Sequence, residues 1–163
     1  MSSWGQGTNL NSMPILDLRD IRGRDGPRVG GKASALARLV RAGFPVPPGF
    51  VITTEEKEMT PALAAELRRR AAELGPWVAV RSSAVGEDGE RTFAGQYETT
   101  LGVAPEDTEG AVLACWASAD SERVRAYRGG RGAMAVLVQR QVASRCAGVL
   151  FTVNRPPDRG ARW

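Results

Sequence analysis

The sequence predicts a single α+β domain. Its 163 residues lie within the usual range for one domain. Hydrophobic residues make up 42% of the chain and charged residues 25%, so the chain can bury a core. Segments with helical periodicity and short β-rich runs follow one another in an irregular order, with a predicted hairpin near the end of the chain. That order favours α+β over the regular alternation of a parallel α/β sheet.

The N-terminal third of the chain predicts one helix and one strand behind a flexible tail. Residues 1–13 are mostly polar, rich in Gly, Ser and Asn, and without periodicity. Apolar residues recur at helical spacing over 32–41, and Gly43 follows as a helix stop. The three prolines within 44–50 force an extended turn, which leads into a short strand over 51–53.

The clearest helix signals lie further along. Thr60 and Pro61 form a good N-cap and first-position pair for a helix over 61–74, and Gly75 follows its end. The remaining elements are predicted from alternation and periodicity. In order, they are strands over 77–82 and 97–103, helices over 106–118 and 120–128, and a hairpin of 134–142 with 147–153.

Composition excludes several kinds of chemistry. The chain contains no histidine, so it carries no Ser-His-Asp or Cys-His site, no His-ligated zinc and no phosphohistidine of its own. Its two cysteines, Cys115 and Cys146, form no Cys-x-x-Cys pair and favour a reducing compartment. No signal peptide or membrane-length apolar stretch is visible. We therefore expect a soluble cytoplasmic protein with no membrane partner, whose net charge of +4 suits phosphate-bearing ligands.

A lysine beside two glycines is the first candidate for ligand chemistry. Lys32 follows Gly30 and Gly31 at the start of the helix predicted over 32–41. An anion at such a helix start would meet the ammonium group, free backbone N–H groups and the helix dipole. The spacing approaches a Walker A phosphate loop, but Ala33 has no hydroxyl to hold magnesium, so we reject that motif. On these residues alone, an ordinary surface lysine remains the alternative.

Three further segments carry polar groups that suit a nucleotide. Arg81 is predicted at a strand end, where its guanidinium could bind phosphate oxygens, and a solvated arginine is the alternative. The glycines of the loop over 86–96 allow a ligand to approach the backbone closely, although an ordinary hairpin loop has the same composition. Gln139 ends an apolar run and offers a donor and an acceptor, as an adenine edge requires; the alternative is a solvent-facing hairpin glutamine.

Taken together and in order, three blocks of sequence resemble the pyruvate phosphate dikinase and phosphoenolpyruvate synthase family. The first holds the Gly-Gly-Lys motif and the proline-rich turn, the second the Arg-Ser-Ser motif and the glycine-rich loop, and the third the late β-rich runs. The blocks are Val29–Leu36 with Gly43–Thr53, Val80–Ala84 with Glu87-Asp88 and Phe93–Thr99, and Val138-Gln139 with Ala147–Thr152.

This resemblance implies the N-terminal part of an ATP-grasp nucleotide-binding domain over residues 14–155, with a mixed sheet and flanking helices. In residues 156–163 we recognise no motif of the family, so we expect an unmatched C-terminal tail there. By the resemblance, Lys32 and Arg81 would bind the phosphates of ATP. Gly95 and Thr99 would lie in the loop that closes over those phosphates, and Gln139 would lie beside the adenine. The Phe-Ala-Gly-Gln loop is similar to the phosphoenolpyruvate synthase and rifampin phosphotransferase branch.

The function implied is the ATP-binding portion of a phosphoenolpyruvate synthase-like phosphotransferase. A phosphoryl group from ATP would pass to a histidine on another domain, and from there to pyruvate or another acceptor. The family uses Mg²⁺, but the half that supplies its ligands and the histidine domain are both missing from this sequence. We therefore expect no catalytic residue and no metal ligand here. The chain alone should bind ATP weakly and transfer no phosphate, and another chain or domain would complete the site.

Two other functions are weighed against this one. The chain could be a non-catalytic module that holds a nucleotide, or a partner carrying the missing half. Nucleic-acid binding is suggested by Arg68-Arg69-Arg70 and by the glycine- and arginine-rich run over 128–132. However, the triple arginine lies on a predicted helix, where it is more often a solvated face, and few aromatic residues accompany it. We expect no nucleic-acid partner.

Overall fold

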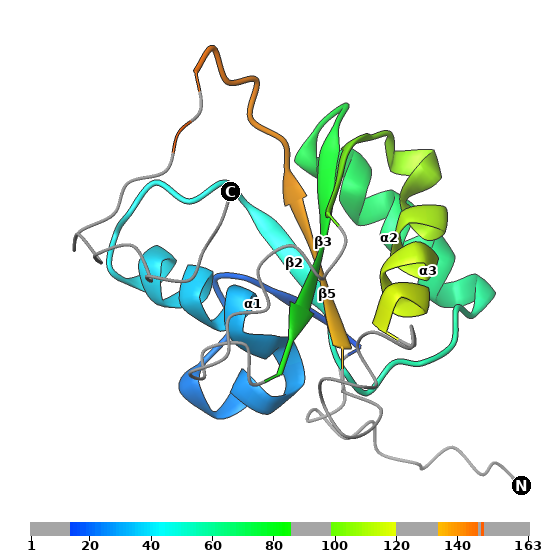
Figure 1. Cartoon of the computed structure of the whole chain (residues 1–163), viewed down its shortest axis with the longest axis horizontal. Coiled ribbons are helices and arrows are strands. Elements are labelled where there is room, and N and C mark those ends of the chain that lie inside the picture. The colour runs from blue at the N-terminus through cyan, green and yellow to red at the C-terminus, as the bar shows by residue number, and fades with distance from the viewer. Residues whose placement is uncertain (1–13, 86–98, 120–133, 147, 149–163) are drawn as a thin grey trace, which may run out of the picture.

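The computed structural model describes residues 14–85, 99–119, 134–146 and 148, which build a five-stranded sheet with helices on both faces (Figure 1). The strands are β1 (Ile15–Asp17), β2 (Gly49–Ile52), β3 (Val78–Ala84), β4 (Thr99–Val103) and β5 (Met134–Arg140). They lie in the order β1-β2-β5-β3-β4. The predicted α+β class is confirmed. The sheet differs from the mixed one that the resemblance implied, because each of the four described pairings is antiparallel.

Three helices cover this sheet. They are α1 (Gly26–Arg41), α2 (Pro61–Leu74) and α3 (Thr108–Ala119). Short 3₁₀ turns over Gly23–Asp25 and Pro105–Asp107 precede the first and the last. Figure 1 shows α1 on one face of the sheet, with α2 and α3 side by side on the other. The described part of the chain is thus a three-layer domain.

The bounds of α2 are those predicted, because local groups define both ends. The Thr60 hydroxyl accepts a hydrogen bond from the backbone N–H of Leu63 at 3.1 Å, and Pro61 occupies the first helical position. At the other end, Gly75 adopts φ 139°, a conformation that ends the helix and that other residues rarely adopt.

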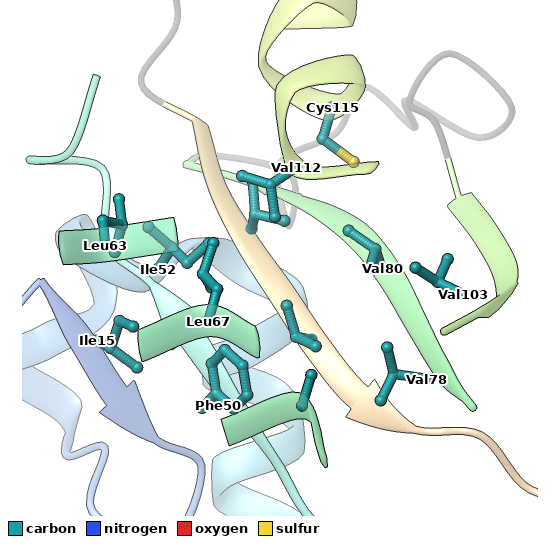
Figure 2. Close-up of a cluster of buried hydrophobic side chains, with 13 residues drawn as sticks. Ile15, Phe50, Ile52, Leu63, Leu67, Val78, Val80, Val103, Val112 and Cys115 are labelled. Atoms are coloured by element: carbon teal, nitrogen blue, oxygen red, sulfur yellow. The ribbon is translucent and has the colours of Figure 1, made fainter. Parts of the chain in front are cut away.

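Two apolar clusters hold the layers together, one on each face of the sheet. Figure 2 shows the larger cluster, in which Phe50 and Ile52 of β2 meet Leu67 of α2 and Val112 and Cys115 of α3. The smaller cluster packs α1 against the opposite face. Its buried members are Leu18, Ile21, Val29, Ala33, Ala37, Val51, Ala135 and Leu137. Alternation along each strand assigns its residues to one face or the other.

One strand differs from its prediction in a way that matters for the site. The sequence predicts this strand over 77–82, with Arg81 at its end. In the structure β3 continues to Ala84, so Arg81 lies inside the strand. The predicted end was wrong because Ser83 and Ala84 remain paired with Ala135 and Met134 of β5, so the sheet ladder extends past Ser82.

Other predicted elements fall outside the described residues. These are the helix over 120–128, the glycine-rich loop beyond Val85, and the second strand of the hairpin over 147–153, of which only Gly148 is described. The first strand of that hairpin is β5, and it lies between β2 and β3 at the centre of the sheet.

Candidate functional site

A break in α1 lies at the Gly-Gly-Lys motif. Gly30 has φ 76° and ψ 174°, so the helix is interrupted there and resumes at Gly31. The prediction of a helix that opens near Gly31 is confirmed for this second segment. Lys32 therefore lies in the first turn of a helix, where backbone N–H groups and the helix dipole favour an anion.

The C-terminal ends of β2 and β3 lie at the same end of the sheet. Residues there donate hydrogen bonds to the backbone carbonyl groups just before this break. The Thr54 hydroxyl donates to the Pro27 carbonyl at 3.3 Å, and the Thr54 N–H donates to that of Arg28 at 2.8 Å. The Ser83 hydroxyl donates to the Val29 carbonyl at 2.7 Å. These contacts hold the break in α1 against the ends of β2 and β3.

Ser83 also binds the chain on the other side of the break. Its hydroxyl oxygen accepts a hydrogen bond from the Ala33 N–H at 3.1 Å, across 50 residues of sequence. The side chain is fully buried, and Gly30 lies against it so closely that an added Cβ would lie 2.2 Å from the Ser83 carbonyl oxygen. The first turn of the helix that carries Lys32 is thus fastened directly to β3.

Arg81 lies on the face of the sheet that α1 covers. It is two residues from Ser83 along the strand, so both side chains leave the same face. Its partner on β5 is Leu137, which packs in the α1-side cluster. The Arg81 side chain is partly buried, and its Nε atom is buried with no hydrogen-bond partner in the structure as described. A buried N–H of a charged group without a partner is costly and calls for an explanation.

The other predicted site residues are placed as follows. Thr99 is exposed at the start of β4, directly opposite Arg81 in the register of the two strands. Gln139 is only 6% exposed, and its amide nitrogen donates to the Pro47 carbonyl at 2.8 Å, so the alternative of a solvent-facing glutamine is wrong. Like Arg81, it belongs to the α1 side of the sheet by alternation. Gly95 lies outside the described residues.

The structure therefore brings the elements that carry Lys32, Arg81 and Thr99 together, although the convergence of their side chains on one ligand stays a prediction. Ser83 and Gly30 are the contributors that sequence reasoning missed. The signal for Gly30 was the pair of glycines before a lysine, and the signal for Ser83 was a hydroxyl next to a predicted strand. Neither local pattern predicts that Gly30 and Ser83 lie in contact.

Two negative findings concern the described residues. They contain no group of three or more His, Cys, Asp or Glu side chains placed to hold a metal ion. No helix among them combines the length and apolar character needed to cross a membrane.

A cavity of about 470 Å³ is lined by residues of β1, of β2 and the turn before it, and of the C-terminal ends of α1 and α2. Its lining includes Pro47, whose carbonyl accepts the hydrogen bond from Gln139. None of the four predicted site residues that the structure describes lines it. Arg69 and Arg70 do, but both are already paired with Glu66 of the same helix. Arg68 likewise pairs with Glu109 of α3. Each of the three arginines thus has an ion-pair partner within the chain.

Comparison with known proteins decides the family. The family described as "Pyruvate phosphate dikinase, AMP/ATP-binding domain" matches residues 55–162, a range that contains Arg81, Thr99 and Gln139. The chain belongs to this family. Its described sheet and helices are accordingly part of a nucleotide-binding domain, as the sequence motifs predicted.

Relatives extend the match toward the N-terminus. A phosphoenolpyruvate synthase of Aeropyrum pernix is 34% identical over 198 residues, which cover 86% of this chain and 24% of that protein. A rifampicin phosphotransferase of Streptomyces sp. is 33% identical over 193 residues, covering 86% of this chain and 22% of that protein. A prodigiosin synthesizing transferase of Serratia marcescens is 34% identical over 178 residues, covering 88% and 20%. The chain spans about a quarter of the length of these relatives or less.

These alignments are longer than the chain itself. The first two run over 198 and 193 positions, against 163 residues in this sequence. The relatives therefore carry residues within the matched region that have no counterpart here.

Proposed function

We propose that the chain binds the phosphates of ATP on the α1 side of its sheet, with Lys32 and Arg81 as the cationic contacts. The observation that carries this is the buried, unpartnered Nε of Arg81 on the strand to which the first turn of the Lys32 helix is bonded. A phosphate oxygen would satisfy that N–H, and a guanidinium binds phosphate through several parallel hydrogen bonds. Thr99 lies at the start of β4 and not in the loop where the resemblance placed it, and it would contact the phosphates from there, opposite Arg81. Gly95 would contact them from the closing loop, with Gln139 toward the base.

We further propose that this binding serves phosphoryl transfer in a larger assembly. Relatives named for different products or acceptors, a phosphoenolpyruvate synthase and a rifampicin phosphotransferase, resemble this chain to the same extent. A region shared so evenly fits the nucleotide step rather than recognition of the acceptor. Because the chain has no histidine, a histidine that receives the phosphoryl group would belong to another domain or chain. Mg²⁺ would neutralise the phosphate charge, with ligands supplied by another domain or chain.

The proposal is tested by nucleotide titration of the 163-residue chain, followed by NMR. Lys32→Met and Arg81→Met should each weaken ATP binding by about tenfold, because each removes one charge-assisted contact to phosphate. Neither should change the much weaker binding of adenosine, which has no phosphate.

Two variants control for loss of charge. Lys57→Met removes an exposed lysine after β2, and Arg68→Met removes an exposed arginine of α2, on the opposite side of the sheet from α1. Both should bind ATP like the unmodified chain. If Lys32→Met and Arg81→Met bind ATP as tightly as these controls, the proposed site is wrong.

A further inference from the structure

The helix that carries Lys32 is capped by a residue from another strand. With the helix resuming at Gly31, Gly30 occupies the N-cap position, whose side chain normally accepts a hydrogen bond from an N–H two or three residues on. Gly30 has no side chain to do so. The Ala33 N–H, three residues on, donates instead to the Ser83 hydroxyl of β3 at 3.1 Å.

The glycine is what allows this arrangement. Its φ of 76° is a conformation that residues with a Cβ rarely adopt. An added Cβ would also lie 2.2 Å from the Ser83 carbonyl oxygen and 2.7 Å from the Ser83 hydroxyl oxygen. Any N-cap residue with its own side chain would therefore push the helix away from β3. The lack of a capping side chain at Gly30 is thus what allows the Ser83 hydroxyl of β3 to cap the helix.

We propose that Ser83 is a positioning residue of the nucleotide site, an inference that rests on the proposed function. Its hydroxyl accepts from Ala33 and donates to Val29, so it bonds to the chain on both sides of the break. Arg81 leaves the same face of the same strand two residues away. The two hydrogen bonds thereby set the position of the Lys32 turn relative to Arg81.

Burial makes these hydrogen bonds consequential. Ser83 is 0% exposed, so water cannot replace its hydroxyl. Without it, the Ala33 N–H and the Val29 carbonyl would be left unpaired in the interior, a state that the chain can relieve by shifting the first helical turn. Groups that bind one phosphate chain together lose affinity when their spacing is relaxed.

The neighbouring serine is a matched control. Ser82 is 1% exposed, but its side chain leaves the opposite face of β3, and its hydroxyl has no hydrogen-bond partner in the structure as described. It pairs across the sheet with Val136, which belongs to the cluster beneath α2 and α3. Ser82→Ala therefore removes the same atom from the same depth without touching α1.

The experiment compares Ser83→Ala, Ser82→Ala and the unmodified 163-residue chain by NMR titration with ATP and with adenosine, at a temperature where circular dichroism shows each to be folded. Ser83→Ala should bind ATP about tenfold more weakly and adenosine unchanged, because its effect acts through the phosphate-binding groups. Ser82→Ala should match the unmodified chain with both ligands. Hydrogen exchange of the Ala33 amide should be faster in Ser83→Ala alone.

Each contrary result has a distinct meaning. If folded Ser83→Ala binds ATP as the unmodified chain does, the inference fails and the proposed function stands. If it loses affinity for ATP and adenosine equally, Ser83 has only a structural role and the inference also fails. If the unmodified chain binds neither ligand, the proposed function fails and takes this inference with it. Should Ser83→Ala not fold, Ser83→Cys replaces it. Its thiol is a weaker donor and acceptor, so a several-fold loss for ATP alone is expected, and unchanged affinity overturns the inference.

Discussion

At the scale of single residues, the molecule depends on a few positions where backbone conformation or polar burial is unusual. Gly30 combines a positive φ with contact against the backbone of β3. Ser83 and Arg81 place polar atoms inside the domain, one with its hydrogen bonds made and the other with a buried N–H unpaired. Residues whose conformation or burial departs from local preference tend to cluster at functional sites.

Replacement of Gly30 should show how much the close approach of helix and strand matters. Gly30→Ala must bear the strain of a positive φ and also clash with the Ser83 carbonyl, so we expect a loss of about 3 kcal/mol or more in the free energy of unfolding. The measurement is equilibrium unfolding in urea.

Gly43 supplies the matched comparison for this variant. It has φ 81°, nearly the same conformation, but an added Cβ would meet nothing within 4 Å. Gly43→Ala should therefore cost only about 1 kcal/mol, the strain alone. Equal losses for the two variants would contradict the role assigned to the contact with Ser83.

At the scale of elements, α2 shows how a helix is held by local groups on its outer face. Glu66 accepts hydrogen bonds from Arg69 at 2.7 and 2.8 Å and from Arg70 at 2.7 Å. Arg69 also pairs with Glu73, and the Arg70 guanidinium lies 5.9 Å from the centre of the Phe50 ring. The apolar side of the helix meanwhile fills the core beneath it (Figure 2).

The carboxylate of Glu66 predicts a pH dependence of stability. Hydrogen bonds from Arg69, and then from Arg70, lower the pKa of Glu66 to about 2 from a usual value of 4.5. Because the folded-state pKa lies below the unfolded one, the stabilisation is present above pH 4.5 and is lost as the pH falls toward 2. The side chain is 38% exposed, so solvent screening limits the contribution to about 0.5 kcal/mol.

Glu66→Gln tests this by urea unfolding across that pH range. The variant should be less stable than the unmodified chain near pH 6, and the difference should shrink toward pH 2. Glu58→Gln, which removes a carboxylate from the connection between β2 and α2, controls for net charge and should leave that pH dependence in place. A stability gap between Glu66→Gln and the unmodified chain that stays constant from pH 6 to pH 2 would show that the ion pairs contribute nothing measurable.

At the scale of the whole molecule, three layers place the candidate site on one side of the sheet. The helices α2 and α3 bury the larger cluster and leave the α1 side to carry the polar groups of the site (Figure 1). The same region recurs in relatives about four times longer or more. The chain thus corresponds to a nucleotide-binding segment of these relatives, and the reaction proposed for it needs a histidine that this sequence does not contain.

The absence of histidine makes one prediction about the reaction. Incubated with ATP labelled on the γ-phosphate, with or without Mg²⁺, the purified chain should acquire no acid-labile, base-stable phosphate, since no imidazole is present to accept it. Filter binding after alkaline denaturation provides the measurement, and a histidine-phosphorylated protein in parallel verifies that the label survives. Stoichiometric labelling of the chain would mean that another side chain serves as phosphoryl acceptor.

Local sequence signals by themselves determined α2, the existence of a helix at Lys32, and the family. Thr60, Pro61 and Gly75 act within one turn of each helix end, so the bounds of α2 needed no tertiary information. Lys32 and Arg81 were recognised because their neighbours form ordered motifs. The family match confirms the family and covers Arg81, and the roles of both residues stay predictions.

Only the tertiary structure decided where β3 ends, that the three-residue β1 exists, and that Gly30 and Ser83 form one unit. Each depends on partners distant in the chain: β5 carries the ladder past Arg81, β2 pairs with β1, and the Ser83 hydroxyl meets Ala33 across 50 residues. A serine beside a predicted strand reads as a strand end, because serine competes locally for the backbone's hydrogen bonds. Here β5 pairs with the backbone of β3 at Ser83, and α1 provides the hydrogen-bond partners of the Ser83 hydroxyl. No local sequence pattern predicts those partners.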